Sequence, residues 1–214
     1  MKKEYIIAIA IFFVVIGAFY YFISSITSQQ TKRETSIEPT SKPMQILSRP
    51  AMQIDANKSY TAVLQTTEGD ISITLNAKET PNTVNNFVYL AKKSFYDKTI
   101  FHRVIKGFMI QGGDPAGNGT GGPGYTFEDE KFSGEYKRGV IAMANRGTNT
   151  NGSQFFIMHA DYPLQKNYVI FGSVTKGMDV VDKIAEAPVS VSATGEESKP
   201  VNPVMVKKVT ISEQ

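Results

Sequence analysis

Alternation of hydrophobic and polar residues predicts that most of the chain beyond residue 58 forms short β-strands. Residues 60–66 and 71–75 alternate in this way, and the Glu-Gly-Asp sequence between them is typical of a hairpin turn. The later strand-like segments are residues 99–114, 139–145, 154–159, 168–174 and 204–211. In the first of these, Gly107 allows a local break in the pleat.

Two segments with a helical period interrupt the strands. In residues 81–94, Thr80 suits the N-cap and Pro81 the first helical position. The apolar residues on one face of this predicted helix are Val84, Phe87, Val88 and Ala91. The second helical pattern covers residues 178–187. Many short strands with two isolated helices predict a mostly β fold with a closed antiparallel sheet.

The N-terminal part of the chain has a different pattern. Residues 5–23 include no charged residue and, as a helix, would span roughly 28 Å, close to the thickness of a bilayer core. A soluble helix would show a polar face, and this one has none. We therefore expect a single transmembrane helix at residues 5–23 after a short tail, residues 1–4. A cleaved signal peptide is the alternative.

The charges around this segment favour one orientation. Lys2 and Lys3 lie close to the apolar run, which places the N-terminus inside and the following domain on the extracytoplasmic side of the cell membrane. Cleavage would instead give a secreted protein. Residues 24–58 are polar and lack periodicity, so we expect a flexible linker. The folded domain is predicted at residues 59–212.

Composition narrows the possible functions of this domain. Residues 51–214 carry 17 Lys and Arg and 17 Asp and Glu, so the net charge of +3 comes from the first fifty residues, and nothing indicates a nucleic-acid partner. The chain has no cysteine, which excludes disulfides and thiol chemistry. Its two histidines, His102 and His159, show no ligand spacing. We expect no metal and no cofactor.

A glycine-rich segment, residues 117–122 (GNGTGG), formally matches the dinucleotide fingerprint. That motif binds a pyrophosphate only where a helix follows the glycines. Here Pro123, Gly124, residues 125–127 (YTF) and then a run of acidic residues follow, which favours a long surface loop.

Arg103 lies in an apolar segment, where a guanidinium needs hydrogen-bonding partners. In a regular strand Arg103, Met109 and Gln111 would share a face, although Gly107 can interrupt the alternation. The placement suits a structural salt bridge. It also suits a binding site in which an arginine and a glutamine stand among apolar side chains, and spacing does not decide between the two.

Several motifs together resemble the cyclophilin family of peptidyl-prolyl cis-trans isomerases. They are FHRVIKGFMIQGGD (residues 101–114), NGTGG (118–122), FEDE (127–130), MANRGTNTNGSQFFI (143–157) and VIFGSV (169–174). The likeness runs from about residue 60 to residue 211. It implies a closed eight-stranded antiparallel β-barrel capped by two α-helices.

The resemblance also implies the positions of the active site. Arg103 matches the catalytic arginine. Gln111 matches a pocket residue, and we expect it to be the second catalytic residue, which would orient the guanidinium. The substrate-binding positions implied are Phe108, Met109, Ala144, Asn145, Gln154, Phe156, Leu164 and Tyr168. Tyr168 ends the segment PLQKNY, where many members have Trp-Leu-Asp-Gly-Lys-His.

The implied activity is acceleration of rotation about X-Pro bonds in polypeptides, which needs no metal or cofactor because no covalent bond is made or broken. On this hypothesis a membrane-anchored monomer assists the folding of proteins outside the cytoplasmic membrane. The alternative is a chaperone or scaffold module that uses the same groove only to bind proline-containing segments.

Overall fold

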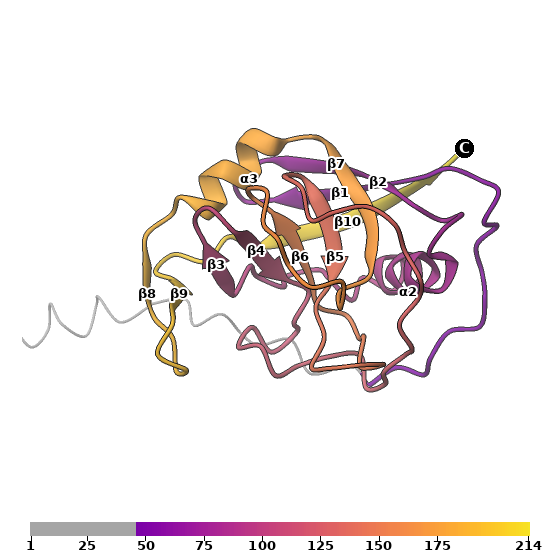
Figure 1. Ribbon diagram of the computed structural model, residues 1–214, viewed down its shortest axis with the longest axis horizontal. Helices are drawn as coiled ribbons and strands as arrows, with labels where there is room; N and C mark the ends of the chain where they lie inside the picture. Colours follow the sequence, from indigo (N-terminus) through magenta and orange to yellow (C-terminus); the bar gives the residue numbers. More distant parts are fainter. Residues whose placement is uncertain (1–45) are drawn as a thin grey trace, which may run out of the picture. The chain divides into compact units, whose positions relative to one another are not determined.

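The computed structural model describes residues 46–214, in which eight strands form one antiparallel sheet (Figure 1). These strands are β1 (Tyr60–Thr66), β2 (Asp70–Leu75), β3 (Arg103–Ile105), β4 (Met109–Gly112), β5 (Val140–Met143), β6 (Phe155–Met158), β7 (Ile170–Lys176) and β10 (Val206–Glu213). Their order in the sheet is β10-β1-β2-β7-β5-β6-β4-β3. Helix α2 (Pro81–Lys92) packs near β10, and helix α3 (Met178–Ala185) lies beside β2, β3 and β4. The predicted mostly β fold, with an eight-stranded antiparallel sheet and two helices in this part of the chain, is confirmed.

The sheet is curled but not closed, so the prediction of a closed barrel is wrong. Strands β3 and β10 are its two edges and form no ladder with each other. The segment before β3 does meet the start of β10, where Ile100 and Met205 form an isolated bridge and Val206 exchanges backbone hydrogen bonds with Lys98 and Thr99. The three-residue strand β3 instead lies beside β9 (Glu197–Pro200), which pairs with β8 (Val189–Val191) in a separate hairpin (Figure 1). Sequence analysis missed this hairpin, which occupies the region beside the edge of β3.

Residues 99–114, predicted as one strand with a break, instead contain a hairpin. Strand β3 turns back into β4, with Arg103 opposite Gln111 and Ile105 opposite Met109. The backbone N–H of Phe108 donates to the carbonyl of Ile105 at 3.1 Å, and Gly107 has a φ of 78° in the turn. A left-handed glycine allows a reversal here that most residues would resist.

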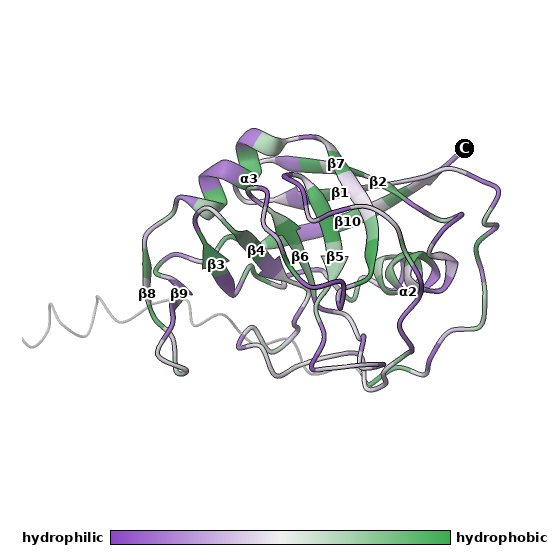
Figure 2. Cartoon of the chain, viewed as in Figure 1, coloured by the Kyte–Doolittle hydropathy of each residue, from purple (hydrophilic) through white to green (hydrophobic). Residues whose placement is uncertain are grey.

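The central strands present apolar side chains to two faces. On one face Ile110, Ile141 and Ile157 join the main core, together with Phe87 of α2. On the other face Met109 and Phe156 belong to a second buried cluster. Such alternation follows from the two-residue period of a strand. Figure 2 shows hydrophobic residues along β4, β5 and β6.

Helix α2 begins at Pro81, as predicted, but Thr80 does not cap it with its side chain. The carboxylate of Glu130 does so instead, by accepting the backbone N–H groups of Asn82 at 2.9 Å and Thr83 at 2.7 Å. A negative charge at a helix N-terminus is favourable because it meets the free N–H groups and the positive end of the helix dipole. The loop that carries Glu130 is thereby fixed to the helix.

The segment at residues 46–58, assigned to a linker in the sequence analysis, packs against the domain. The side chain of Ile54 joins the main core, the N–H of Gln53 donates to Asn85 at 2.7 Å, and Arg49 forms a bidentate ion pair with Glu128 at 2.9 and 2.6 Å. The predicted tail (1–4), transmembrane helix (5–23) and first part of the linker lie outside the described residues. From residue 46 onward, no helix is long and apolar enough to cross a membrane.

Candidate active site

Register across four strands places predicted site residues in one row. Arg103 on β3 is opposite Gln111 on β4, Gln111 is opposite Phe156 on β6, and Phe156 is opposite Ala142 on β5. Residues opposite one another in neighbouring strands project from the same face of a sheet. The prediction that Arg103, Met109 and Gln111 share a face is therefore confirmed, even though a turn separates them.

An apolar cluster lies on this face of the sheet. Its buried members are Met109, Tyr136, Ala142, Phe156, Met158 and Ile170, and those partly buried are Ile105, Phe108, Phe132, Val140, Ala144, Leu164 and Tyr168. The rings of Phe156 and Tyr168 meet edge to face with centroids 5.5 Å apart. The guanidinium carbon of Arg103 lies 5.9 Å from the centroid of the Phe108 ring. A charged donor therefore stands at the border of an apolar surface.

A chain of amide hydrogen bonds leads away from Arg103. Its Nη1 lies 3.5 Å from Oε1 of Gln111, and Nε2 of Gln111 donates to Oε1 of Gln154 at 3.0 Å. Nε2 of Gln154 in turn donates to the carbonyls of Gly119 at 3.1 Å and Gly121 at 2.9 Å. Each amide is held by the next, so the orientation of Gln111 depends on a loop beyond the sheet.

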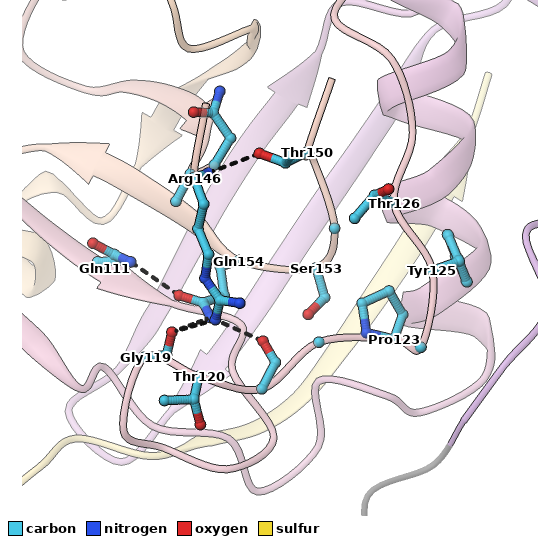
Figure 3. Close-up of a pocket in the computed structure, with 16 residues that line it drawn as sticks. Gln111, Gly119, Thr120, Pro123, Tyr125, Thr126, Arg146, Thr150, Ser153 and Gln154 are labelled. Atoms are coloured by element: carbon cyan, nitrogen blue, oxygen red, sulfur yellow. Dashed lines mark hydrogen bonds between the residues drawn. The ribbon is translucent and has the colours of Figure 1, made fainter. Parts of the chain in front are cut away.

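A cavity of about 640 Å³ adjoins the apolar cluster (Figure 3). It shares with the predicted site the residues Gln111, Ala144, Asn145 and Gln154. Arg146 extends across it and donates from Nη2 to the carbonyl of Gly119 at 2.9 Å (Figure 3). The cavity shares Ala144 with the apolar cluster, and the rest of its lining consists mainly of polar side chains and glycine-rich backbone.

The glycine-rich segment forms a loop along this cavity, as predicted, and the part of the chain between β4 and β5 contains no helix. Asp114 is fully buried, and its carboxylate accepts the backbone N–H groups of Ala116 at 2.8 Å, Asn118 at 3.0 Å and Gly119 at 2.6 Å. These N–H groups are thus bound within the protein, so they form no cradle for a phosphate.

Arg103 also forms a salt bridge, so the two interpretations of this residue are compatible. Its Nε and Nη2 donate to the two carboxylate oxygens of Glu196 at 2.6 and 2.7 Å. The side chains remain 34% and 38% exposed. Hydrogen bonding to Arg103 lowers the pKa of Glu196 to about 2, so this carboxylate is charged at neutral pH.

The two histidines differ in their surroundings within the domain. Burial lowers the pKa of His102, which favours its neutral form. Nδ1 of His159 accepts the N–H of Gly107 at 2.9 Å, and its Nε2 lies 3.3 Å from Asp182. Among residues 46–214, no three His, Cys, Asp or Glu side chains converge as metal ligands would.

Each of the ten predicted site residues belongs to the apolar cluster, to the chain of amide hydrogen bonds or to the cavity lining. Sequence reasoning missed Tyr136, Arg146 and Glu196. Tyr136 is buried, its hydroxyl donates to the carbonyl of Tyr168 at 2.9 Å, and it accepts the N–H of Tyr168 at 3.1 Å. No local pattern marks Tyr136, because its partner is 32 residues away.

Replacing Tyr136 with phenylalanine is expected to lower the free energy of unfolding by about 1–2 kcal/mol, because it leaves both backbone groups of Tyr168 without a partner. Urea unfolding of the purified chain measures this. Tyr162→Phe is the matched control, because this ring is exposed and its hydroxyl contributes little. Equal unfolding midpoints for the two variants would contradict the role given to Tyr136.

The curled eight-stranded sheet with two helices and the arginine beside an apolar cluster define a cyclophilin-like protein. The family described as "Cyclophilin type peptidyl-prolyl cis-trans isomerase/CLD" matches residues 61–211. The chain is 45% identical over 178 residues to a probable peptidyl-prolyl cis-trans isomerase A of Mycobacterium leprae, covering 72% of this chain and 93% of the relative. It is 45% identical over 155 residues to peptidyl-prolyl cis-trans isomerase-like 3 of Gallus gallus, covering 69% and 93%.

Comparison with solved structures indicates the same family as these relatives. A crystal structure of a cyclophilin type peptidyl-prolyl cis-trans isomerase of Cryptosporidium parvum superposes with a TM-score of 0.67 at 36% identity, over 73% of this chain and 99% of that one. A second structure of that protein, in the presence of the dipeptide Ala-Pro, gives a TM-score of 0.66 at 36% identity, over 72% and 99%. The chain therefore belongs to the cyclophilin family and is a peptidyl-prolyl cis-trans isomerase.

Proposed function

We propose that Arg103 is the catalytic residue of this isomerase, that Gln111 orients it, and that the apolar cluster holds the proline ring. An X-Pro bond resists rotation because the nitrogen lone pair is delocalised into the carbonyl, with a barrier of about 18–20 kcal/mol. In the twisted state the nitrogen regains its lone pair. A guanidinium can donate to this nitrogen and to the prolyl carbonyl, and it remains charged at any working pH.

The observation that carries this proposal is the row from Arg103 through Gln111 to Phe156, which places a fixed donor at the edge of an apolar surface. Phe108, Phe156 and Leu164 supply that surface. Apolar surroundings exclude water and so strengthen the hydrogen bonds that form in the twisted state. The structure of the C. parvum relative in the presence of Ala-Pro lends support, since that dipeptide contains the chemical group in question.

The energy required is modest. An acceleration of roughly 10⁴–10⁵ corresponds to about 5.5–7 kcal/mol of preferential stabilisation of the twisted state. A few charge-assisted hydrogen bonds in a dry pocket are of this size. No nucleophile or metal is needed.

The cavity beside the cluster would hold the residues that precede proline. Ala144 and Asn145 line it, and the side chain of Asn145 is held by the protein, because its Nδ2 donates to the carbonyl of Asn167 at 2.7 Å and its Oδ1 accepts the N–H of Gly147 at 3.2 Å. The backbone at Asn145 is then the part that faces a bound peptide. Tyr168 would close the apolar side of this groove.

A proline-binding chaperone module is the second candidate, because a groove of this kind can hold a peptide without rotation being its purpose. The fixed guanidinium favours the enzyme, since binding alone needs only the apolar surface. An Arg103→Ala variant separates the two candidates. If the variant cannot replace the wild-type protein in cells, catalysis is required. If it can, binding of proline-containing segments is sufficient.

We propose further that residues 5–23 anchor the isomerase in the cell membrane, with the domain on the extracytoplasmic side, where it assists folding. The uncharged run of 19 residues supports this. The full chain is expected in the carbonate-resistant membrane fraction, whereas a variant that lacks residues 1–45 is expected in the soluble fraction. Protease added to spheroplasts should digest the domain of the full chain. Recovery of the full chain as an intact soluble protein would contradict the anchor, and its intact mass would show whether the segment had been cleaved.

A further inference from the structure

The hairpin of β8 and β9 brings an acidic side chain to the candidate active site. The hairpin lies beside β3 at the edge of the large sheet (Figure 1). At its turn the N–H of Ser192 donates to the carbonyl of Glu196 at 2.7 Å, and the N–H of Glu196 faces the hydroxyl of Ser192 at 3.3 Å. Glu196 is therefore held at its backbone by the turn itself.

The carboxylate of Glu196 binds one edge of the Arg103 guanidinium. Its two oxygens accept from Nε and Nη2 at 2.6 and 2.7 Å. The remaining nitrogen, Nη1, lies on the other side, 3.5 Å from Oε1 of Gln111 and 3.8 Å from the sulfur of Met109. A planar guanidinium held by two parallel hydrogen bonds cannot turn about its terminal torsions without breaking both.

We propose that Glu196 is a positioning residue for isomerisation, which locks the plane of the Arg103 guanidinium so that Nη1 faces the apolar cluster. This inference rests on the proposed catalytic role of Arg103. A free arginine samples many rotamers, and each productive encounter would have to select one of them. Because the Glu196 carboxylate holds the guanidinium in one orientation from outside the groove, this selection is made before the substrate binds.

The position of Glu196 also argues against a role in which its carboxylate blocks substrate binding. A carboxylate that competed with substrate would lie over the apolar cluster or between Arg103 and Gln111. Glu196 instead occupies the Nε edge and leaves Nη1 beside Gln111 and Met109. Because the pKa of Glu196 is low, the carboxylate that binds Arg103 is charged at neutral pH.

The test compares kcat and KM of full-length variants on a proline-containing peptide. We expect Glu196→Gln to lower kcat about tenfold with KM within about twofold of wild type, because the guanidinium is displaced while the apolar cluster still binds. Glu196→Asp keeps the charge on a shorter side chain and should recover part of the loss. A variant with wild-type kcat, or with a higher one, would overturn the proposal, the latter because it would show that the carboxylate restrains catalysis.

Two control variants isolate the effect. Glu197→Gln makes the same charge change at the neighbouring exposed residue, and Glu128→Gln disrupts another bidentate arginine–glutamate pair, with Arg49. Both should retain wild-type kcat, and all variants should keep a similar Tm. A loss of activity in either control equal to that of Glu196→Gln would overturn the specific role of Glu196.

A double variant separates this inference from the proposed function. If Arg103→Ala retains a low but measurable activity, adding Glu196→Gln should cause no further loss, because Glu196 acts only through Arg103. Additive losses would overturn the inference and leave Arg103 as the catalytic residue. Full activity of Arg103→Ala would refute the proposed function itself.

Discussion

Substitution of Arg103 by alanine is expected to lower kcat/KM for a prolyl peptide by about 10²–10³-fold, the loss typical when one preorganised transition-state donor is removed. The variant should remain folded. Arg103 is 34% exposed, and ion pairs at such positions contribute about 0–1 kcal/mol to stability. A protease-coupled isomerisation assay measures the activity, and thermal unfolding measures the fold.

Arg49→Ala is the matched control for this experiment. It also removes an arginine from a bidentate pair with a glutamate, but the pair with Glu128 is not part of the candidate site. The control should keep wild-type turnover. Arg103→Lys preserves the charge and loses the planar fork, so an intermediate loss is expected if geometry matters as well as charge. Normal turnover by Arg103→Ala would show that another group donates the hydrogen bond to the twisted X-Pro bond.

The row of functional side chains could be anticipated because strand periodicity is a local property. Arg103, Met109 and Gln111 have the same parity, and the reversal at Gly107 preserves it because Arg103 pairs directly with Gln111. Each residue of this set lies within a few positions of the others in the sequence. A local pattern therefore predicted the shared face, on the condition that Gly107 did not interrupt the alternation, whereas the roles of these residues were implied only by the resemblance to the cyclophilin family.

Glu196 could not be anticipated in this way. It lies 93 residues from Arg103, in a polar segment with the composition of a loop. Its contact exists only because the hairpin of β8 and β9 lies at the edge of β3. The open edge of the sheet was missed for the same reason, since closure depends on how the sheet curls and not on the sequence of any one strand.

The second large effect is expected at Asp114. Asp114→Ala should lower the free energy of unfolding by about 3 kcal/mol, because three backbone N–H groups lose a charged acceptor at a fully buried position. Asp114→Asn retains the size of the side chain but turns one oxygen into a donor, so part of this loss should remain. Urea unfolding measures both, and Asp179→Ala, at an exposed position in the first turn of α3, should change little.

Asp114→Ala should also lower the isomerase activity, because a chain of amide hydrogen bonds connects the loop of Asp114 to Gln111. Asp114 fixes the loop whose carbonyls at Gly119 and Gly121 accept from Gln154, and Gln154 accepts from Gln111. If the loop relaxes, Gln111 loses its fixed partner and no longer orients the guanidinium. We therefore expect kcat/KM of folded Asp114→Ala to fall about tenfold at a temperature well below its Tm. Wild-type turnover per folded molecule would show that the loop stabilises the protein without serving the site.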